Sequence, residues 1–410
     1  MANKHILFIS YDGMTDPLGQ SQVIPYLTKL TKYGYRFTIL SCDKPDKLAL
    51  HKDAVLALLA PYPIKWVPVY YHKSPPVLSS IYDFLQLKNK AVSLHKKDAF
   101  DIVHTRVGVP TLVGLHLKKK YGVRYLNDIR GFWADERVDG GMWNIKNPLY
   151  KMIYHFFRKK EDECINIADY NTCLTYAAKA EIHTWPQINN QPIKIEVIPC
   201  CADLDLFNPN NIDVKVKQQL QQELQINEGD IIISYLGSIG GWYLTDEMMR
   251  CCKMISDAMP QVKFLFISPH LHHIIAQAAA KYNLAPEKLI VKHVQRNQVP
   301  VLLSCSHYSI FFIKPCYSKM SSSPTKHGEI MAMGIPVITN SGVGDVKEIV
   351  QKYNAGFVVD DFSEASFNNI VTQLKTLPVF NRVGIRKGAE EFYALDIAAQ
   401  RYDSVYQAIP

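Results

Sequence analysis

Residues 321–340 read SSSPTKHGEIMAMGIPVITN and contain the residue types that bind a phosphorylated ligand. Ser323 precedes Pro324, a combination that predicts a helix beginning at Pro324 with Ser323 as its N-cap. The free amides and the dipole of such a helix start attract phosphate oxygens, and Lys326 adds a cation beside them. Glu329 lies on the same helix face, where its carboxylate is able to accept hydrogen bonds from ribose hydroxyls.

An alternative interpretation makes this segment purely structural. Ser323 would then only cap a helix, and Lys326 and Glu329 would form a pair on the surface. Ile330 and Met333 have the spacing of a core-facing helix stripe, so we expect them to pack rather than to contact a ligand.

Further candidates lie in the first half of the chain, where polar residues follow predicted strands. Gly19 and Gln20 fall between the first predicted strand and the first helix, so the backbone there is able to approach a sugar phosphate closely. A plain turn is the alternative for this glycine. His104 ends the strand predicted at residues 101–104, and is either functional or an ordinary histidine with satisfied hydrogen bonds.

Two arginines and a tryptophan also follow predicted strands. Arg106 comes after the strand at residues 101–104, while Arg130 and Trp133 come after the strand at residues 123–128. Charged residues at the carboxyl ends of parallel strands lie where open α/β sheets bind ligands. The two arginines are therefore candidates for ligand contacts.

We expect two sheets to position these residues. Short apolar runs alternate with helix-like segments in both halves of the chain. This alternation is typical of parallel sheets built from βαβ units. The candidate strands of the first half are residues 5–10, 35–41, 65–70, 101–104, 123–128, 170–174 and 194–198. Those of the second half are residues 231–236, 262–267, 289–291, 308–313, 336–339 and 356–359.

The length of 410 residues is too great for one ordinary core, so we expect two domains. The segment IPCCADLDLFNPNN lies between the halves, and its Pro, Asn and Asp content predicts an irregular hinge near residues 201–210. The expected domains are residues 1–203 and residues 204–393. Apolar residues at helical spacing predict a terminal helix within residues 394–410.

The composition excludes disordered and collagen-like chains. The hydrophobic fraction is 48% and the charged fraction 20%, which is typical of folded, soluble domains. No apolar run is long enough to cross a membrane, so a cytoplasmic protein is expected. The nine cysteines have no zinc-like spacing and are expected to be reduced. The net charge of +8 is spread out and favours anionic small molecules or an acidic membrane face, with no nucleic acid as partner.

Residues 143–160, WNIKNPLYKMIYHFFRKK, combine aromatic with basic side chains. A helix with such a face is able to rest on an anionic bilayer. The alternative is a helix whose apolar side faces the core and whose basic side is solvated. Membrane contact is therefore a secondary expectation.

Three segments, taken in order, resemble one known family. EIMAMGIPVI is similar to the signature in which a glutamate-bearing helix leads to Ala-Met-x-x-Gly-x-Pro-Val-Ile. The first strand, glycine loop, helix and second strand of that family are similar to the segment ISYDGMTDPLGQSQVIPYLTKLTKYGYRFTIL. IPCCADLDLFNP is similar to its "Ile-Pro-Asn-Gly-Val-Asp-x-x-x-Phe" hinge. The chain thus resembles family 4 of the GT-B glycosyltransferases, of the group 1 type, over nearly its whole length.

This resemblance implies two Rossmann-like domains with parallel sheets that face a central cleft, and a terminal helix that returns to the first domain. It implies transfer of a hexosyl group from a UDP- or GDP-sugar to an acceptor hydroxyl, with retention of configuration and without a bound metal. The acceptor would be a glycan or a lipid-linked sugar in polysaccharide or glycoconjugate synthesis. The enzyme would be cytoplasmic, with possible peripheral contact to the inner membrane face.

The resemblance also implies roles for individual residues. Residues expected to bind the nucleotide sugar are Ser238, Val294, Lys314, Ser322, Ser323, Pro324, Thr325, Lys326 and Glu329. Residues expected to take part in catalysis are Gly19, His104, Arg130 and Lys326. Residues expected on the acceptor side are Gln20, Arg106 and Trp133.

The chain departs from the family pattern at two places. Ser321 stands where the first of two glutamates usually falls, and Ser238 and Gly241 lie near the positions of an arginine and a lysine that usually bind the diphosphate. Lys326 and Lys314 are then the candidate cations. Two other functions stay open: a sugar-nucleotide epimerase or hydrolase on the same fold, and a non-catalytic protein that binds nucleotide sugars.

Overall fold

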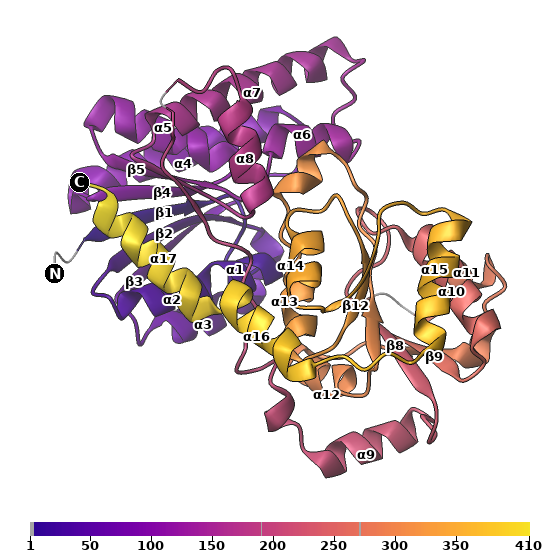
Figure 1. Cartoon of the computed structure of the whole chain (residues 1–410). Helices are drawn as coiled ribbons and strands as arrows, with labels where there is room; N and C mark the ends of the chain where they lie inside the picture. The colour runs from indigo at the N-terminus through magenta and orange to yellow at the C-terminus, as the bar shows by residue number, and fades with distance from the viewer. Residues whose placement is uncertain (1–3, 190, 270–271) are drawn as a thin grey trace. The chain divides into compact units, whose positions relative to one another are not determined.

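The computed structural model describes residues 4–189, 191–269 and 272–410. The chain forms two compact units (Figure 1). The N-terminal unit comprises Met1–Pro199 together with Leu395–Pro410, and the C-terminal unit comprises Cys200–Ala394. The expected boundaries, after residues 203 and 393, fall within a few residues of these.

The N-terminal unit is built on a parallel sheet of seven strands in the order β3-β2-β1-β4-β5-β6-β7. β1 pairs with both β2 and β4, so the strand order reverses beside β1. Ligands of open α/β sheets bind at such a reversal, outside the carboxyl ends of the strands. The strands are β1 His5–Ser10, β2 Arg36–Asp43, β3 Ile64–Tyr70, β4 Ile102–Arg106, β5 Arg124–Ile129, β6 Tyr170–Cys173 and β7 Ile195–Val197.

The helices of this unit connect the strands and cover both faces of the sheet. α4 packs on α5, and α5 and α6 each pack on α7. The helices are α1 Pro17–Gln22, α2 Ile24–Thr31, α3 Pro45–Leu59, α4 Leu78–Asp98, α5 Val109–Tyr121, α6 Trp133–Asp139, α7 Pro148–Ile167 and α8 Tyr176–Thr184.

The last helix, α17 Leu395–Ala408, also belongs to the N-terminal unit. It lies along α2, as the yellow ribbon in Figure 1 shows. Tyr402 and Tyr406 are buried on its inner face, because an apolar helix stripe has to be covered. The spacing of these residues in the sequence predicts this buried face.

The C-terminal unit has a parallel sheet of six strands in the order β10-β9-β8-β11-β12-β13. The reversal here is beside β8, which pairs with β9 and β11. The strands are β8 Ile231–Leu236, β9 Val262–Ile267, β10 Leu289–Lys292, β11 Tyr308–Ile310, β12 Val337–Asn340 and β13 Gly356–Val359. The helices are α9 Val214–Glu223, α10 Thr245–Ala258, α11 His272–Ala280, α12 Val299–Leu303, α13 Thr325–Ala332, α14 Val346–Lys352, α15 Glu364–Lys375 and α16 Arg382–Tyr393.

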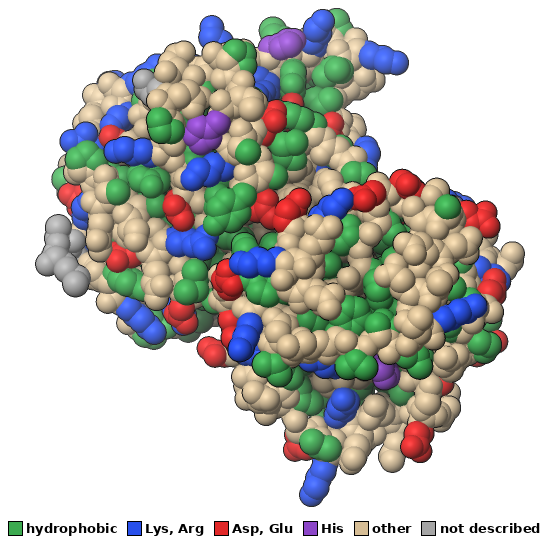
Figure 2. Space-filling view, viewed as in Figure 1, with side chains coloured by type: hydrophobic (Ala, Val, Ile, Leu, Met, Phe, Trp, Pro, Cys, Tyr) green, Lys and Arg blue, Asp and Glu red, His purple; other side chains and the backbone are tan. Residues whose placement is uncertain are grey.

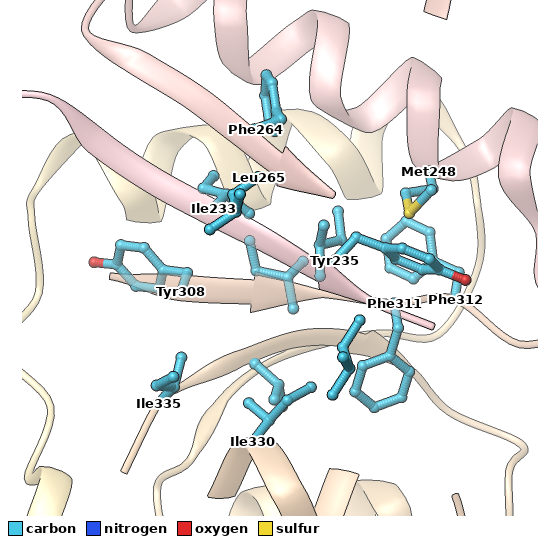
Figure 3. Close-up of a cluster of buried hydrophobic side chains, with 14 of the residues drawn as sticks. Ile233, Tyr235, Met248, Phe264, Leu265, Tyr308, Phe311, Phe312, Ile330 and Ile335 are labelled. Atoms are coloured by element: carbon cyan, nitrogen blue, oxygen red, sulfur yellow. The ribbon is translucent and has the colours of Figure 1, made fainter. Parts of the chain in front are cut away.

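The core of the C-terminal unit holds this sheet against its helices. Figure 3 shows apolar side chains from the sheet, among them Ile233 and Phe264, gathered with Met248 of α10 and Ile330 of α13. Every residue of β8 is buried, as expected for a central strand of a parallel sheet that is covered on both faces. This packing fixes the carboxyl end of β8 and the start of α13, where the candidate ligand-binding residues lie.

Candidate functional site

The predicted junction of loop and helix exists, but it begins later than the sequence suggests. α13 starts at Thr325, and its N-cap position is Pro324, which makes no side-chain capping bond. The Ser323 hydroxyl instead accepts a hydrogen bond from the backbone N–H of Cys200 at 3.2 Å. The predicted role of Ser323 as the N-cap is therefore wrong, because the helix begins one residue later and Pro324 takes the N-cap position.

Lys326 lies in the first turn of α13 and is buried, with 7% of its surface exposed. Its Nζ lies 3.7 Å from the ring centroid of Tyr243 and 4.6 Å from that of Tyr235. No hydrogen-bond partner for Nζ exists among the residues that the structure describes. A Cβ atom at Gly237 would lie 3.0 Å from Nζ, so the glycine leaves room for the ammonium group.

Burial and neighbouring groups act in opposite directions on the charge of Lys326. Burial lowers the pKa of Lys326 to about 7, while the carboxylate of Glu329 raises it. The faces of the two tyrosine rings also favour a cation. A buried ammonium group without a hydrogen-bond acceptor is costly. An anion placed at this position would supply the missing acceptor and restore the usual charge.

Glu329 is buried on the same helix, one turn further on, and is 5% exposed. Its Oε1 accepts a hydrogen bond from Nη2 of Arg296 at 2.7 Å. Burial raises the pKa of Glu329, while Arg296 and Lys326 lower it. The Arg296 side chain is half exposed, so this arginine holds the carboxylate at the edge of the site.

The alternative in which Lys326 and Glu329 form a surface pair does not describe this arrangement, since both side chains are buried. Arg296 was not among the residues predicted from the sequence. It follows β10 by four residues, in HVQRNQ, and a search for cations after each predicted strand would have found it.

The other predicted residues of the C-terminal unit surround this junction. Ser322, Pro324 and Thr325 are partly buried at the start of α13. Val294 packs against the core beyond the end of β10. Ser238 is exposed, and its carbonyl oxygen accepts a hydrogen bond from the hydroxyl of Tyr235.

The segment that follows β8 turns back over the end of β11. The backbone N–H of Lys314 donates to the carbonyl of Trp242 at 2.9 Å, and Tyr243 forms an antiparallel bridge with Ile313. Lys319 Nζ lies 3.7 Å from the Trp242 ring centroid. Lys314 is exposed, whereas Lys326 projects into the fold. The two candidate cations thus have opposite environments.

Ser321, which stands in place of a glutamate, is buried and turned toward its own backbone. Its hydroxyl donates to the carbonyl of Ser318 at 2.6 Å, within the 3₁₀ turn Tyr317–Ser321. This hydroxyl therefore stabilises the turn that precedes α13.

In the N-terminal unit, the predicted residues His104 and Arg130 meet at the buried carboxylate of Asp128. Asp128 Oδ2 lies 3.6 Å from His104 Nε2 and 3.9 Å from Arg130 Nε. Burial raises the pKa of Asp128, but Arg130 and His104 lower it more, to about 2. The hydroxyls of Tyr402 and Thr172 donate to the same carboxylate at 3.2 and 2.8 Å.

His104 itself is 2% exposed and packed against α17. Its Nδ1 is hydrogen-bonded to the Tyr406 hydroxyl at 2.7 Å, and its ring contacts Phe8 edge-on. Burial lowers the pKa of His104, against the influence of Asp128. These contacts match the alternative of a packed histidine better than that of a group exposed to substrate.

Gly19 lies inside α1, which begins at Pro17. A Cβ atom at this position would lie 2.2 Å from the carbonyl oxygen of Gly13, so no larger residue fits without moving the loop. The neighbouring Gln20 is exposed. Gly19 thus allows the chain that follows β1 to fold tightly against the helix start.

The remaining residues predicted for the acceptor side occupy two different surroundings. Arg106 is buried and donates from Nη1 to the carbonyl of Gln22 at 3.1 Å. Trp133 begins α6, where it contacts the rings of Trp143 and Phe157 and lies beneath the guanidinium of Arg137.

The described residues offer neither a cluster for a metal ion nor a helix that could span a membrane. They contain no group of three or more His, Cys, Asp or Glu side chains arranged to hold a metal ion. None of their helices is long and apolar enough to span a membrane.

Comparison with known proteins agrees with this geometry. The model of glycosyltransferase family 4 matches residues 19–206, and the model of glycosyl transferases group 1 matches residues 216–391. Together the two models cover most of both units. No curated protein sequence matches the chain.

Solved structures share the fold at low sequence identity. Sucrose-phosphate synthase from Thermosynechococcus elongatus has a TM-score of 0.73 and 15% identity, with 98% of each chain covered. HepE from Anabaena in complex with UDP has a TM-score of 0.71 and 13% identity, covering 98% of this chain and all of that one. WaaG, a glycosyltransferase of lipopolysaccharide biosynthesis, has a TM-score of 0.66 and 14% identity, covering 96% and 98%.

The order of the two family models, the two parallel sheets and the likeness to these structures agree with one another. The chain is an enzyme that belongs to the GT-B glycosyltransferases of group 1 and family 4.

Proposed function

We propose that this glycosyltransferase binds a nucleoside diphosphate sugar at the start of α13 and transfers its sugar to an acceptor hydroxyl with retention of configuration. The observation that carries the proposal is the ammonium of Lys326, which is buried without a hydrogen-bond partner in the described structure. It lies in the first helical turn, where backbone amides also lack intrahelical acceptors. A diphosphate would satisfy both kinds of donor.

Lys326 and Glu329, one turn apart on α13, would meet different parts of the donor. When the bond between the sugar and the diphosphate breaks, negative charge grows on the leaving phosphate, and Lys326 stabilises that charge. Glu329, held by Arg296, accepts hydrogen bonds from the ribose hydroxyls. The other residues of the proposed donor site are Ser238, Val294, Lys314, Ser322, Ser323, Pro324 and Thr325.

A uridine nucleotide is the donor class that we favour. HepE, whose fold is similar, has been solved with UDP, with UDP and glucose, and with UDP-glucose. A GDP-sugar is the alternative donor. WaaG acts in lipopolysaccharide biosynthesis, which supports a role in cell-surface glycan or glycoconjugate synthesis.

The acceptor would bind in the N-terminal unit, near the carboxyl ends of its strands. The proposed contacts with the acceptor are Gly19, Gln20, Arg106, Arg130 and Trp133. His104 is proposed to act from inside the fold, since its ring is covered by α17. It would hold Asp128, which in turn positions Arg130.

A thermal-shift screen of nucleotide sugars tests the proposed donor site. A ligand at about 100 times its dissociation constant adds roughly 2.7 kcal/mol of stability, which is readily measured. We expect UDP-sugars to raise the melting temperature of the enzyme, and to do so far less for the Lys326→Ala variant. Lys375→Ala, an exposed lysine of α15, is the matched control.

Release of free nucleotide then identifies the reaction. Release that requires an acceptor supports transfer, whereas equal release without any acceptor would indicate hydrolysis. Binding without turnover over a broad acceptor panel would indicate a non-catalytic binding protein and would contradict the proposal.

A further inference from the structure

A large apolar groove lies in the N-terminal unit, with a volume of about 1170 Å³. We use the name apolar groove for the space between the start of α4, α5, α6 and residues 149–160 of α7. Representative lining residues are Ile81, Phe84, Leu112, Trp133, Ile153 and Phe157. Its volume exceeds the roughly 300–1,000 Å³ of ordinary small-molecule sites.

The helices beside the groove expose apolar side chains at helical spacing. On α4 these are Leu78, Ile81, Tyr82 and Leu85, each between 41% and 64% exposed, and Ile81 is the one that lines the groove. On α7 they are Leu149, Met152 and Phe156, between 47% and 63% exposed. Scattered exposed apolar residues are normal, but two exposed stripes beside one groove mark a binding surface.

The rim of the groove is basic. Its charged residues are Lys73, Lys119, Lys120, Arg137 and Lys160, and no Asp or Glu occurs among the described residues that line it. Lys119 and Lys160 share a single carboxylate, that of Glu163. Figure 2 shows Lys and Arg side chains mixed with hydrophobic ones over the part of the surface where α7 lies. The rim therefore carries an excess of positive charge.

One end of the groove reaches the carboxyl edge of the sheet. Tyr11 directly follows β1, Tyr71 directly follows β3, and both line the groove. Val109 and Trp133 line it as well, a few residues beyond β4 and β5. This is the edge at which open α/β sheets bind their ligands.

We propose that the apolar groove holds the single hydrocarbon chain of a lipid phosphate that carries the acceptor sugar. The chain would lie against the apolar walls, and the phosphate would be held at the carboxyl edge of the sheet, where Lys73 follows β3 and Arg137 lies on α6. This inference rests on the proposed function, and it names the class of acceptor. The groove is concave and has room for a long hydrocarbon chain, whereas a flat bilayer surface would not enter it.

A second copy of the protein fits the surface poorly. A symmetric contact places the same patch of each subunit face to face, so the two basic rims would repel each other. An anionic lipid removes this repulsion and neutralises the rim.

Binding of n-alkyl phosphates below their micelle concentrations tests the proposal without any donor or turnover. Calorimetric titration with octyl, decyl and dodecyl phosphate should give affinities that rise about fourfold per added methylene group. Inorganic phosphate should bind at least a hundredfold more weakly than dodecyl phosphate. An affinity independent of chain length would overturn the proposal.

Variants at exposed positions of the groove separate binding from folding. Met152→Glu and Phe156→Glu place a charge on the groove wall at positions that are already 63% and 47% exposed. Each should weaken the binding of dodecyl phosphate at least tenfold with an unchanged melting temperature. Leu50→Glu, at an apolar residue of α3 that is 75% exposed, is the control and should bind normally.

Anionic vesicles distinguish a bilayer from a single lipid. If the enzyme binds vesicles of phosphatidylglycerol and phosphatidylcholine but no alkyl phosphate, the groove faces a membrane and the proposal is wrong. If dodecyl phosphate binds as expected but no nucleotide sugar does, the proposed donor site fails while the groove assignment holds. Equal binding by the groove variants and the parent would also overturn the assignment.

Discussion

Lys326 combines burial with a positive charge that the fold around it does not neutralise by a hydrogen bond. Its ammonium is in contact with two tyrosine rings, and its neighbour Glu329 is already bonded to Arg296. Such an arrangement costs stability when no ligand is bound. Binding sites often accept this cost because an incoming anion removes it. The cost and its removal can be measured separately.

The first prediction concerns stability against pH. The folded pKa of Lys326 is about 7 against an ordinary value of 10.5, so between these values the unfolded state binds more protons and stability rises with pH. Lys326→Met lacks this dependence. The variant should be more stable than the parent by on the order of 4 kcal/mol at pH 7, and the gap should narrow by about 2 kcal/mol at pH 9.

Urea unfolding at both pH values measures this difference. Lys375→Met, at an exposed lysine of the same unit, should show neither the gain nor its pH dependence. A pH-independent gain for Lys326→Met would mean that Lys326 is not neutralised by burial.

The second prediction concerns protons taken up on binding. A bound diphosphate favours the charged form of Lys326 and therefore raises its pKa. At pH 8, where the unliganded side chain is mostly neutral, binding of UDP should take up close to one proton. Calorimetry in two buffers with different ionisation enthalpies counts this proton. Lys326→Met should take up none, and equal uptake by both proteins would exclude Lys326 as the group responsible.

Among the elements, α17 has the clearest structural task. It covers the polar cluster at the carboxyl ends of β4 and β5, where Tyr406 bonds His104 and Tyr402 bonds Asp128. The cluster is fully buried, so each of its hydrogen bonds replaces one that water would otherwise supply. The helix thus closes the N-terminal unit around charged groups.

The third prediction tests whether His104 is a packed residue. Tyr406→Phe removes the hydroxyl bonded to His104 Nδ1 and leaves a buried ring nitrogen without its partner. This change should cost about 1–3 kcal/mol of stability and leave the donor KM unchanged. Tyr82→Phe, at a tyrosine that is 56% exposed, is the control and should cost nothing measurable in urea unfolding. Unchanged stability with lost activity would instead favour a catalytic His104.

Element positions could be predicted from the sequence wherever burial alone determines them. The strands β1, β8 and β9 fall on the predicted ranges, because a parallel strand covered on both faces is a continuous apolar run. The edge strand β13 also falls on its predicted range, although its burial alternates. Other strands are shorter than predicted because strand pairing ends before the apolar run does. β11 ends at Ile310, although the apolar sequence continues to Ile313. Those last residues instead meet the segment after β8 through the bridge of Ile313 with Tyr243.

The site was less predictable because its contacts span long distances in sequence. Ser323 looked like a helix cap, but its oxygen binds the amide of Cys200. The pairing of Arg296 with Glu329 and the packing of Lys326 on Tyr235 come from separate strand ends brought together by the sheet. Sequence spacing within one segment carries no information about such neighbours.

At the scale of the whole molecule, two units with separate cores should respond separately to a ligand. All residues of the proposed donor site lie within Cys200–Ala394. Heating should therefore give two calorimetric transitions, since chains of several domains depart from two-state unfolding. UDP should move one transition upward by several degrees, and Lys326→Met should abolish only that shift. An equal shift of both transitions would contradict a donor site confined to one unit.

Steady-state kinetics of Lys326→Ala and Glu329→Ala test the central claim most directly. Losing the cation should lower kcat by about 10²-fold or more, because charge grows on the leaving diphosphate. Losing Glu329 should mainly raise the donor KM, because ribose contacts are equal in the ground and transition states. If both variants keep kcat and donor KM within about twofold of the parent, a change below about 0.5 kcal/mol, the start of α13 does not bind the donor.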